Sequence, residues 1–526
     1  MIMGLIRAFA VLAVFSFACG DAGAADLKYR IRKRICEMYD TCPTTSGSSS
    51  SSGGSGGGDT TPPTASGFSP ADEAADVWTT ANLVITFDED IGKGASGNII
   101  IMDSVGGGEV ETIAVGAANV TLNGAIATIN PASDLAAGSY YVTVDAGTFT
   151  DTAGNPFVGI AGSSTWNFAV AAGVPASFQD FATHQALDWE AFVMNGETYL
   201  AIANGYNDVT YSLNSKIYKF NSGTAQFEDF QAIPTVQAVD WNFFTIGGEP
   251  YLAVSNYMGG GVKVYKFNPG TTQFDEFRSI VIGYPFDSET FVIDGETYFA
   301  VANAYPYNTT SKIYRFSPDT LQFVEIQAIS TSGAYSMESF VIDGETYLAV
   351  ANDYDGSTYN LNSRVYKFDS GTGQFSEFQS IPTNGARDFE SFVIDGEMYL
   401  AVVNSYNGSS VNINSRIYKF NSGTEQFSEF QSIPTNGAFD WESFTAGGNA
   451  YLAVANSSNG STYNINSKVY RFDLAAGQFV EVQNFPTNSA ADWEFFTAGG
   501  EEFLVVGNGY NGSSYNNISK IYRFYR

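Results

Sequence analysis

Paired carboxylates recur along the C-terminal two-thirds of the sequence, and they are the residues whose spacing is best suited to chemistry. Aspartate occupies one register position in six repeats: Asp188, Asp240, Asp287, Asp388, Asp440 and Asp492. Glutamate stands two positions later in six repeats: Glu190, Glu289, Glu338, Glu390, Glu442 and Glu494. Pairs of carboxylates can perform acid/base chemistry on glycosides, and their oxygens are the ligands that Ca²⁺ prefers.

Two main interpretations of these carboxylates stay open. An axial ring of carboxylates would repel itself, and a Ca²⁺ ion would neutralise it. Alternatively, each carboxylate accepts backbone N–H bonds or pairs with a basic residue, and 14 of the 24 basic residues lie on one recurrent strand of the repeats. Catalysis fits less well, because an active site needs one asymmetric constellation and these residues recur equivalently in nearly every repeat. We therefore expect no catalytic residues and no certain cofactor.

Composition excludes several further classes of function. The 526 residues carry 24 basic and 55 acidic side chains, for a net charge of −31, which repels nucleic acid and anionic membranes. The single histidine, His184, and three cysteines provide little material for a His-based metal site or a Ser-His-Asp triad. Abundant glycine and aromatic residues favour an all-β protein outside the cytoplasm.

The elements that must position the carboxylates form seven repeats between residues 178 and 526. An asparagine closes a YLAVAN-like run in each repeat, at Asn204, Asn256, Asn303, Asn352, Asn404, Asn456 and Asn508. The intervals of 52, 47, 49, 52, 52 and 52 residues indicate one supersecondary unit per repeat. Asn-Gly, Asp-Gly or Gly-Gly lies eight residues earlier and predicts a tight hairpin.

Two more strands complete each unit, read for example as RVYKF (364–368) and QFSEFQSI (374–381). Four strands repeated seven times predict a seven-bladed β-propeller, with the carboxylates on the innermost strands. The array opens on a fourth strand at Phe178 and ends after a third strand. We therefore expect the first strand to complete the last blade.

The motifs F-x-E-F-Q-x-I-P-T, D-W-E-x-F, D-G-E-x-Y-L-A-V-A-N and S-K-I-Y-K-F together resemble the epitempin-type (EPTP) repeats over all of 178–526. The resemblance implies a seven-bladed propeller that serves extracellular protein recognition. Individual blades depart from the pattern: Ser336-Met337 replaces Asp-Trp, Asn242 replaces a glutamate, and the loop after Asn256 is short.

A separate β-sandwich is expected over residues 62–171, where short apolar runs such as LVITF (83–87) and YYVTV (140–144) alternate with turn residues. This region resembles the bacterial Ig-like domains of surface-layer and adhesin-type proteins, which implies a spacer or adhesive module. The corner from Asp151 to Asn155 is interpreted as a side-chain-stabilised turn, with a calcium site as the alternative.

The N-terminus predicts export. Residues 1–25 resemble a secretory signal, with an alternative in which Cys19 is lipidated and anchors the chain to a membrane. Cys36 and Cys42 lie in the following segment, 26–61, and predict a disulfide, with two free thiols as the alternative. The rest of that segment is Ser/Gly-rich and predicts a flexible linker.

Loop composition points to the face that binds a partner. The loops after the marker asparagines vary and are rich in Tyr, Asn, Ser and Gly, which form adaptable contact surfaces, although merely solvated loops are the alternative. The candidate ligand-binding residues are Tyr206, Asn207, Tyr305, Tyr354, Asp355, Tyr406, Asn407, Tyr510 and Asn511.

The functional hypothesis is a monomeric, exported recognition or adhesion protein on a bacterial surface or in the extracellular space, bound to a protein or glycan. A carbohydrate-active enzyme and a structural matrix protein are the alternatives. Among the remaining repeat residues, the tryptophans beside the carboxylates are expected to fill space between blades, and the marker asparagines to bond their own loop backbone.

Overall fold

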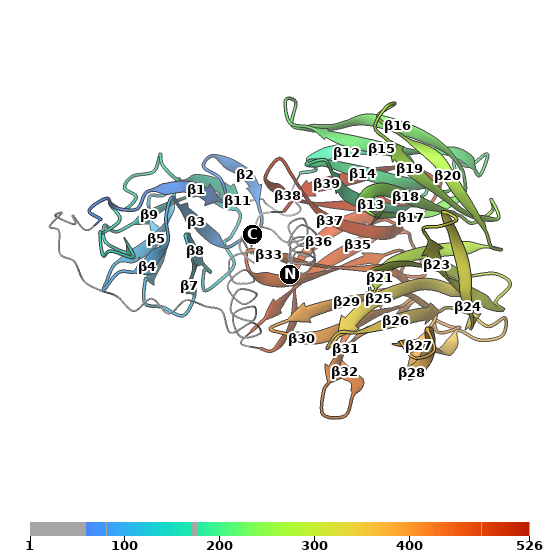
Figure 1. The fold of residues 1–526 in the computed structure, drawn as a ribbon. Coiled ribbons are helices and arrows are strands. Elements are labelled where there is room, and N and C mark those ends of the chain that lie inside the picture. Colours follow the sequence, from blue (N-terminus) through green and yellow to red (C-terminus); the bar gives the residue numbers. More distant parts are fainter. Residues whose placement is uncertain (1–58, 80, 171–175, 475, 525–526) are drawn as a thin grey trace, which may run out of the picture. The chain divides into compact units, whose positions relative to one another are not determined.

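The structure is a computed structural model that describes residues 59–79, 81–170, 176–474 and 476–524 (Figure 1). Every regular element in these ranges is a β-strand, which confirms the all-β class. Within the same ranges, no helix has the length and apolar character that a bilayer crossing needs. The predicted signal at 1–25, Cys19, the Cys36–Cys42 pair and the linker up to residue 58 lie outside the described residues.

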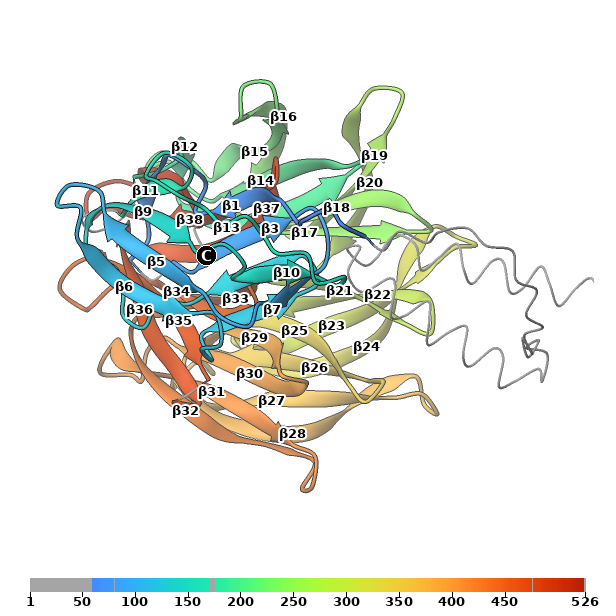
Figure 2. The same ribbon diagram turned by 90° about the vertical axis from the view of Figure 1, so that its left-hand side faces the viewer.

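Eleven strands form the Ig-like region (Figure 1 and Figure 2, blue to teal). They are β1 (Ala65–Ser69), β2 (Ala74–Val77), β3 (Leu83–Phe87), β4 (Ile91–Lys93), β5 (Asn98–Asp103), β6 (Glu109–Ala114), β7 (Val120–Asn123), β8 (Ile126–Ile129), β9 (Gly138–Val144), β10 (Phe149–Asp151) and β11 (Asn167–Val170). One sheet has the order β1-β3-β8-β7, a second β2-β11-β9-β5-β6, and β4 pairs with β10. Ile85 and Ile101, from different sheets, belong to one buried core, so the two larger sheets form the expected sandwich.

Seven four-stranded antiparallel sheets follow as the blades. Blade 1 comprises β13 (Ala186–Met194), β14 (Glu197–Asn204), β15 (Ser212–Asn221) and β16 (Gln226–Val236). Blade 2 comprises β17 (Ala238–Ile246), β18 (Glu249–Asn256), β19 (Gly261–Asn268) and β20 (Gln273–Val281). Blade 3 comprises β21 (Pro285–Ile293), β22 (Glu296–Asn303), β23 (Asn308–Ser317) and β24 (Gln322–Ser332). Blade 4 comprises β25 (Ala334–Ile342), β26 (Glu345–Asn352), β27 (Asn360–Asp369) and β28 (Gln374–Asn384). Blade 5 comprises β29 (Ala386–Ile394), β30 (Glu397–Asn404), β31 (Asn412–Asn421) and β32 (Gln426–Asn436). Blade 6 comprises β33 (Ala438–Ala446), β34 (Asn449–Asn456), β35 (Asn464–Asp473) and β36 (Gln478–Asn488). Blade 7 comprises β37 (Ala490–Ala498), β38 (Glu501–Asn508), β39 (Asn516–Arg523) and β12 (Gln179–His184).

The sequence of one blade explains its local structure. The second strand β30 is buried from Tyr399 to Asn404, which accounts for its unbroken apolar run. Asp395 and Gly396 precede it with φ angles of 51° and 81°. Two positive φ angles define the type I′ turn, which glycine tolerates best and which matches strand twist. All seven blades have this pair of positive φ angles at the same turn.

The ring closes through the first strand of the repeat region. β12 pairs with β39 in antiparallel register, from Gln179 opposite Ile521 to His184 opposite Asn516. The prediction that the N-terminal strand completes the last blade is therefore confirmed. β12 has six residues, whereas β16 and β28 have eleven, so the outer strand at the seam is the shortest of the seven.

The inner strands of neighbouring blades contact one another all the way around, including β13 with β37 across the seam. The carboxylate-bearing strands are thus innermost, as predicted. Each hydrophobic cluster of the propeller joins two adjacent blades, as where Tyr399 of blade 5 packs in one cluster with Trp441 and Leu452 of blade 6. The four tryptophans of the repeats are at most 2% exposed and fill space between blades, also as predicted.

Candidate functional site

The carboxylate rings are built from hydrogen bonds between blades. Asp188 accepts the backbone N–H of Trp241 in the next blade at 2.8 Å, and Glu190 accepts that of Phe243 at 2.7 Å. The same pair of bonds links blade 5 to blade 6 and blade 6 to blade 7, and Asp492 and Glu494 close the circle onto blade 1. In the five blades that carry both carboxylates, the inner strand therefore holds its neighbour through both of them.

The two departures from the carboxylate pattern keep the same connection with other atoms. In blade 4, the Ser336 hydroxyl stands at the aspartate position and accepts the N–H of Phe389 at 3.4 Å. In blade 2, the Asn242 side-chain oxygen accepts a bond from the Thr290 hydroxyl. The position therefore requires a hydrogen-bond acceptor, and a negative charge is not needed at every blade.

The structural interpretation of the rings, in which each carboxylate accepts backbone N–H bonds or pairs with a basic residue, is confirmed through its backbone part. Twelve of the fourteen third-strand basic residues pair with acids of the second or fourth strand of their own blade, such as Lys216 with Asp229 at 3.0 Å. No ion pair among the described residues involves a ring carboxylate. The basic side chains lie on the outer part of each blade, too far from the axis to reach the rings.

Burial raises the pKa of every ring carboxyl. The pKa is raised to about 7 for Asp388 and Glu289 and to about 8 for Glu190 and Glu442, chiefly by burial and against the backbone hydrogen bonds that each accepts. For Asp188, burial raises the pKa well above its usual value, and repulsion from Asp492 adds to the effect. The rings therefore favour protons or cations.

The aspartate ring lines a hollow of about 100 Å³, and its donor atoms are of the type that Ca²⁺ prefers. Ligands about 2.4 Å from one ion lie within about 4.8 Å of each other. Within the described ranges, only Asp59, Glu89 and Asp151 bring three such oxygens within 4.8 Å. A cation among the aspartates would therefore need water ligands or side-chain rotation, and axial Ca²⁺ stays a prediction.

The acidic trio belongs to the Ig-like corner singled out by the sequence. Asp151 accepts bonds from the backbone N–H and the side-chain amide of Asn155, both at 2.7 Å, and Gly154 adopts a φ of 94°. The interpretation as a side-chain-stabilised turn is thus confirmed. Burial, with repulsion from Asp151 and Asp59, raises the pKa of Glu89. A calcium site here stays a prediction.

The candidate ligand residues divide by role on the variable-loop face. The Asn407 side-chain oxygen accepts the backbone N–H groups of Ser409 and Ser410 at 3.0 and 2.8 Å. Asn207, Asp355 and Asn511 make the same bonds in their loops. These four side chains shape the loops from within, which leaves the tyrosines as the residues that present rings.

We call the connected tyrosines of this face the tyrosine belt. Ring centroids of successive members lie 4.3–5.3 Å apart. One arc runs through Tyr463, Tyr510, Tyr515, Tyr206 and Tyr211, and the other through Tyr257, Tyr284, Tyr305, Tyr307, Tyr354, Tyr359 and Tyr406. Five of these twelve were predicted from the sequence. Tyr211, Tyr307, Tyr359, Tyr463 and Tyr515 stand near the end of the same loops, where the second tyrosine of the Y-N-G-S-S-Y pattern could have indicated them, whereas Tyr257 and Tyr284 lie outside that pattern.

One basic residue stands at the mouth of the channel. Arg387 lines the same hollow as the aspartate ring, where the other blades carry Leu, Val, Phe, Tyr or Ala. Its guanidinium lies 3.8 Å from the Phe439 ring centroid, and its Nε lies 3.7 Å from Asp353. Arg387 was not among the residues predicted from the sequence, although it is the single basic residue at that register position.

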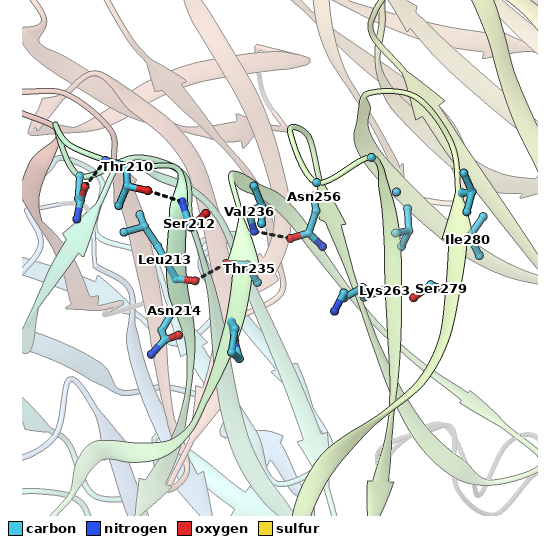
Figure 3. Close-up of a pocket in the computed structure, with 17 residues that line it drawn as sticks. Thr210, Ser212, Leu213, Asn214, Thr235, Val236, Asn256, Lys263, Ser279 and Ile280 are labelled. Atoms are coloured by element: carbon cyan, nitrogen blue, oxygen red, sulfur yellow. Dashed lines mark hydrogen bonds between the residues drawn. The ribbon is translucent and has the colours of Figure 1, made fainter.

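The short loop after Asn256 leaves a hollow of about 720 Å³ between blades 1 and 2 (Figure 3). Elsewhere a longer loop covers the start of the preceding third strand, as where Asn412 donates to the carbonyl of Asn459 in the next blade. Ser212, Thr235 and Lys263 line the uncovered space, with Asn256 bonded to the backbone of Val236 at 2.8 Å. The loop after Asn256 is about five residues shorter than the loop after Asn204, and the hollow lies beside it.

Family models match both parts of the chain. The model described as the EPTP domain matches seven successive segments, at 176–221, 226–268, 273–317, 322–369, 374–421, 426–473 and 478–524. The chain belongs to the EPTP domain family. The bacterial Ig-like domain model matches residues 59–170, ahead of the EPTP repeats. An Ig-like domain followed by EPTP repeats fits a binding or adhesion architecture at a cell surface or outside the cell.

Curated relatives of the EPTP repeats include the thrombospondin-type laminin G domain and EAR repeat-containing proteins of Homo sapiens and Mus musculus. They are 38% and 37% identical to this chain, and each match covers 31% of this chain and 33% of the relative. The chain thus spans about a third of the length of these relatives.

Solved structures similar to the chain include the periplasmic gluconolactonase of Pseudomonas aeruginosa. It has a TM-score of 0.46 and 15% identity, over 77% of this chain and all of that one. A putative 6-phosphogluconolactonase of Bacteroides fragilis has a TM-score of 0.45 and 13% sequence identity. The match covers 61% of this chain and 90% of that protein. Similarity at this level carries no argument about activity.

Proposed function

We propose that this chain is a non-catalytic recognition or adhesion protein, exported to the surface of a bacterium or the space around it. In this proposal the Ig-like domain is a spacer. The EPTP propeller is the head that binds an extracellular protein or glycan through its variable-loop face. The observation that carries the proposal is the tyrosine belt on that face.

The belt has the physical properties of a contact surface. Tyr305, Tyr307 and Tyr463 are 42%, 41% and 44% exposed, so their rings are accessible. Tyrosine offers large amphipathic area at a low cost in side-chain entropy, and the loops beneath it are held by their internal asparagine bonds. A partner would therefore meet an ordered aromatic surface that needs little rearrangement.

The absence of catalysis is proposed from the distribution of the acidic residues. The ring carboxylates are equivalent from blade to blade, and each accepts hydrogen bonds that join the blades. A glycosidase needs two carboxyl groups in distinct environments, one of them a proton donor. Here burial raises the pKa values on every blade in the same direction.

The test compares two variants of the full chain. We expect Tyr305→Ser combined with Tyr307→Ser to weaken binding to the surface ligand at least tenfold, because exposed aromatic anchors dominate contact energies. The control is Val341→Ser, which changes a side chain 55% exposed beside the tight turn at the opposite end of a blade. Ligands are sought among envelope proteins and on a glycan array, and affinity is measured by calorimetry.

Three results would contradict the proposal. Equal binding by both variants would mean that the variable-loop face does not bind the ligand. Release of a modified sugar product during incubation with bound glycans would establish the enzyme alternative, and concentration-dependent self-association without any ligand would favour the matrix alternative.

A further inference from the structure

The tyrosine belt is interrupted between blades 5 and 6. In the intact parts, the second tyrosine of one loop contacts the first tyrosine of the next: Tyr359 and Tyr406 lie 4.8 Å apart, and Tyr463 and Tyr510 lie 5.0 Å apart. At the interruption, the second position of the blade 5 loop is Val411 and the first position of the blade 6 loop is Ser458. Both partners of one contact have been replaced by smaller residues.

A hollow of about 640 Å³ lies at this interruption, a volume within the range of small-molecule sites, roughly 300–1,000 Å³. Val411 and Ser458 line it, together with Tyr463, Tyr510 and Tyr515. The hollow therefore includes the place where other pairs of neighbouring loops hold two tyrosine rings in contact. Because no other pair of neighbouring loops carries this double replacement, the hollow is specific to one point of a repetitive ring.

The lining combines aromatic rings with uncharged polar groups. Ser457, Ser461, Ser489 and Gln185 lie around the hollow, and the side-chain oxygen of Gln185 is buried without a hydrogen-bond partner. The equivalent oxygen of Gln237, which does not line this hollow, is buried without a partner in the same way, so this feature belongs to the repeat. The serine hydroxyls are the groups that the hollow offers to a ligand.

The charged residue of the hollow is already engaged. Arg387 reaches it from the channel mouth, but its guanidinium stacks on Phe439 and its Nε faces the Asp353 carboxylate at 3.7 Å. The neighbouring aspartate ring and the net charge of −31 oppose an anionic ligand. An anionic ligand is therefore disfavoured, and the uncharged polar groups of the lining match a neutral ligand.

We propose that this hollow, which we call the belt gap, binds one ring of a neutral saccharide. The apolar C–H face of a sugar ring would pack against the tyrosines, and its hydroxyl groups would bond to the serines. This inference rests on the proposed function, because it assigns the ligand class and the position of the site on the same face.

The repeat itself supplies a variant that closes the belt gap without disturbing the fold. Gly437, beside Val411, repeats Gly385, which stands beside Tyr359 in the preceding blade. A tyrosine at position 411 would thus meet the same backbone as Tyr359 does. We expect the double variant Val411→Tyr, Ser458→Tyr to fold with an unchanged Tm and to fill the belt gap.

The experiment measures binding of the full chain to an array of neutral and acidic oligosaccharides, followed by calorimetry on the best neutral ligand. The double variant should bind at least tenfold more weakly, and so should Tyr510→Ala. Val209→Tyr is the control, since it adds a tyrosine at an 84% exposed loop position away from the belt gap. It should bind as the parent does.

Three outcomes would overturn the inference: unchanged affinity of the double variant, selective binding of acidic glycans, or no saccharide binding up to about 10 mM, where affinity is negligible. If a protein partner bound the face and was lost with Tyr305 and Tyr307, the proposed function would stand and the belt gap assignment would fall. If no ligand of any class bound the loop face, both would fall.

Discussion

At the scale of single residues, the marker asparagines do more than the sequence indicated. Asn404 is fully buried, donates from its side-chain nitrogen to the carbonyl of Asn414 at 2.9 Å, and so bonds its own blade as predicted. Its side-chain oxygen also accepts the backbone N–H of Asn384 in the preceding blade at 2.8 Å. One side chain thus ties a loop to its own strand and to the neighbouring blade.

We expect Asn404→Ala to destabilise the propeller by roughly 1–3 kcal/mol, because it leaves the half-buried N–H of Asn384 and the carbonyl of Asn414 without their side-chain partner. Chemical denaturation monitored by tryptophan fluorescence measures the loss. Ser376→Ala, a change at an exposed residue of β28, is the control and should leave stability within about 0.5 kcal/mol of the parent. Equal stability of the two variants would contradict the role of Asn404 in joining the two blades.

At the scale of elements, outer strands of neighbouring blades are joined by the glutamine of the F-x-E-F-Q motif. Gln379 in β28 donates to the carbonyl of Phe427 in β32 and accepts the N–H of the same residue, both at 2.8 Å. The side-chain amide therefore imitates one rung of a β-ladder between strands that are not otherwise paired. At Arg278 of blade 2, the guanidinium takes over the donor role and bonds the carbonyl of Leu321 at 2.9 Å.

The seam offers an internal comparison for this bridge. Gln483 of blade 6 faces the shortened outer strand β12 and bonds the carbonyl of its own neighbour, Asn484, at 3.0 Å. We expect Gln379→Ala to lower the free energy of unfolding by about 1–3 kcal/mol. Gln483→Ala should cost markedly less, because within the described residues Gln483 bonds to no other blade. Urea denaturation of both variants checks the difference, and equal losses would contradict it.

At the scale of the whole molecule, closing seven blades into a ring gathers twelve carboxyl groups on one axis. Burial raises their pKa values, and like charges across the axis raise several of them further. Unfolded, these groups would titrate near their ordinary values of about 4. The folded propeller therefore binds more protons than the unfolded chain between about pH 4 and pH 8.

Stability should consequently fall as pH rises through that window, since the free energy of unfolding decreases wherever the folded state holds more protons. In a chelating buffer, we expect Tm to be higher at pH 5.5 than at pH 8.5. Glu442→Gln keeps an acceptor for the N–H of Phe495 but removes one ionisable group whose pKa is raised to about 8. It should flatten the profile and add roughly 1–3 kcal/mol at pH 8.

Glu425→Gln, at an exposed loop position, serves as the matched control and should leave the profile unchanged. Addition of Ca²⁺ at pH 8 tests whether a cation or protons neutralise the ring carboxylates. A rise in Tm that disappears in Glu442→Gln would support an axial cation, whereas an unchanged Tm would leave protons as the neutralising species. A parent profile that rises with pH would contradict the raised pKa values.

Much of the fold could be predicted from short-range signals. The two-glycine or Asp-Gly turns, the apolar second strands and the interval near 50 residues specify a blade, because each is set by local backbone geometry or burial within the repeat. The candidate site was predicted less completely. Five belt tyrosines were named, whereas Arg387, the glutamine bridges and the role of Val411 and Ser458 depend on contacts between different blades.

The sequence by itself determined that seven equivalent units exist, that their first strands carry the acids, and that Phe178 begins the strand that closes the ring. Only the tertiary structure decided what the acids do: most of them accept backbone N–H groups of the next blade, while the basic side chains of the third strands pair with acids of their own blade. The reason is geometric. Periodicity along a chain fixes which residues are equivalent, but packing in three dimensions fixes which of them face a neighbour, a proton-rich axis or an open gap.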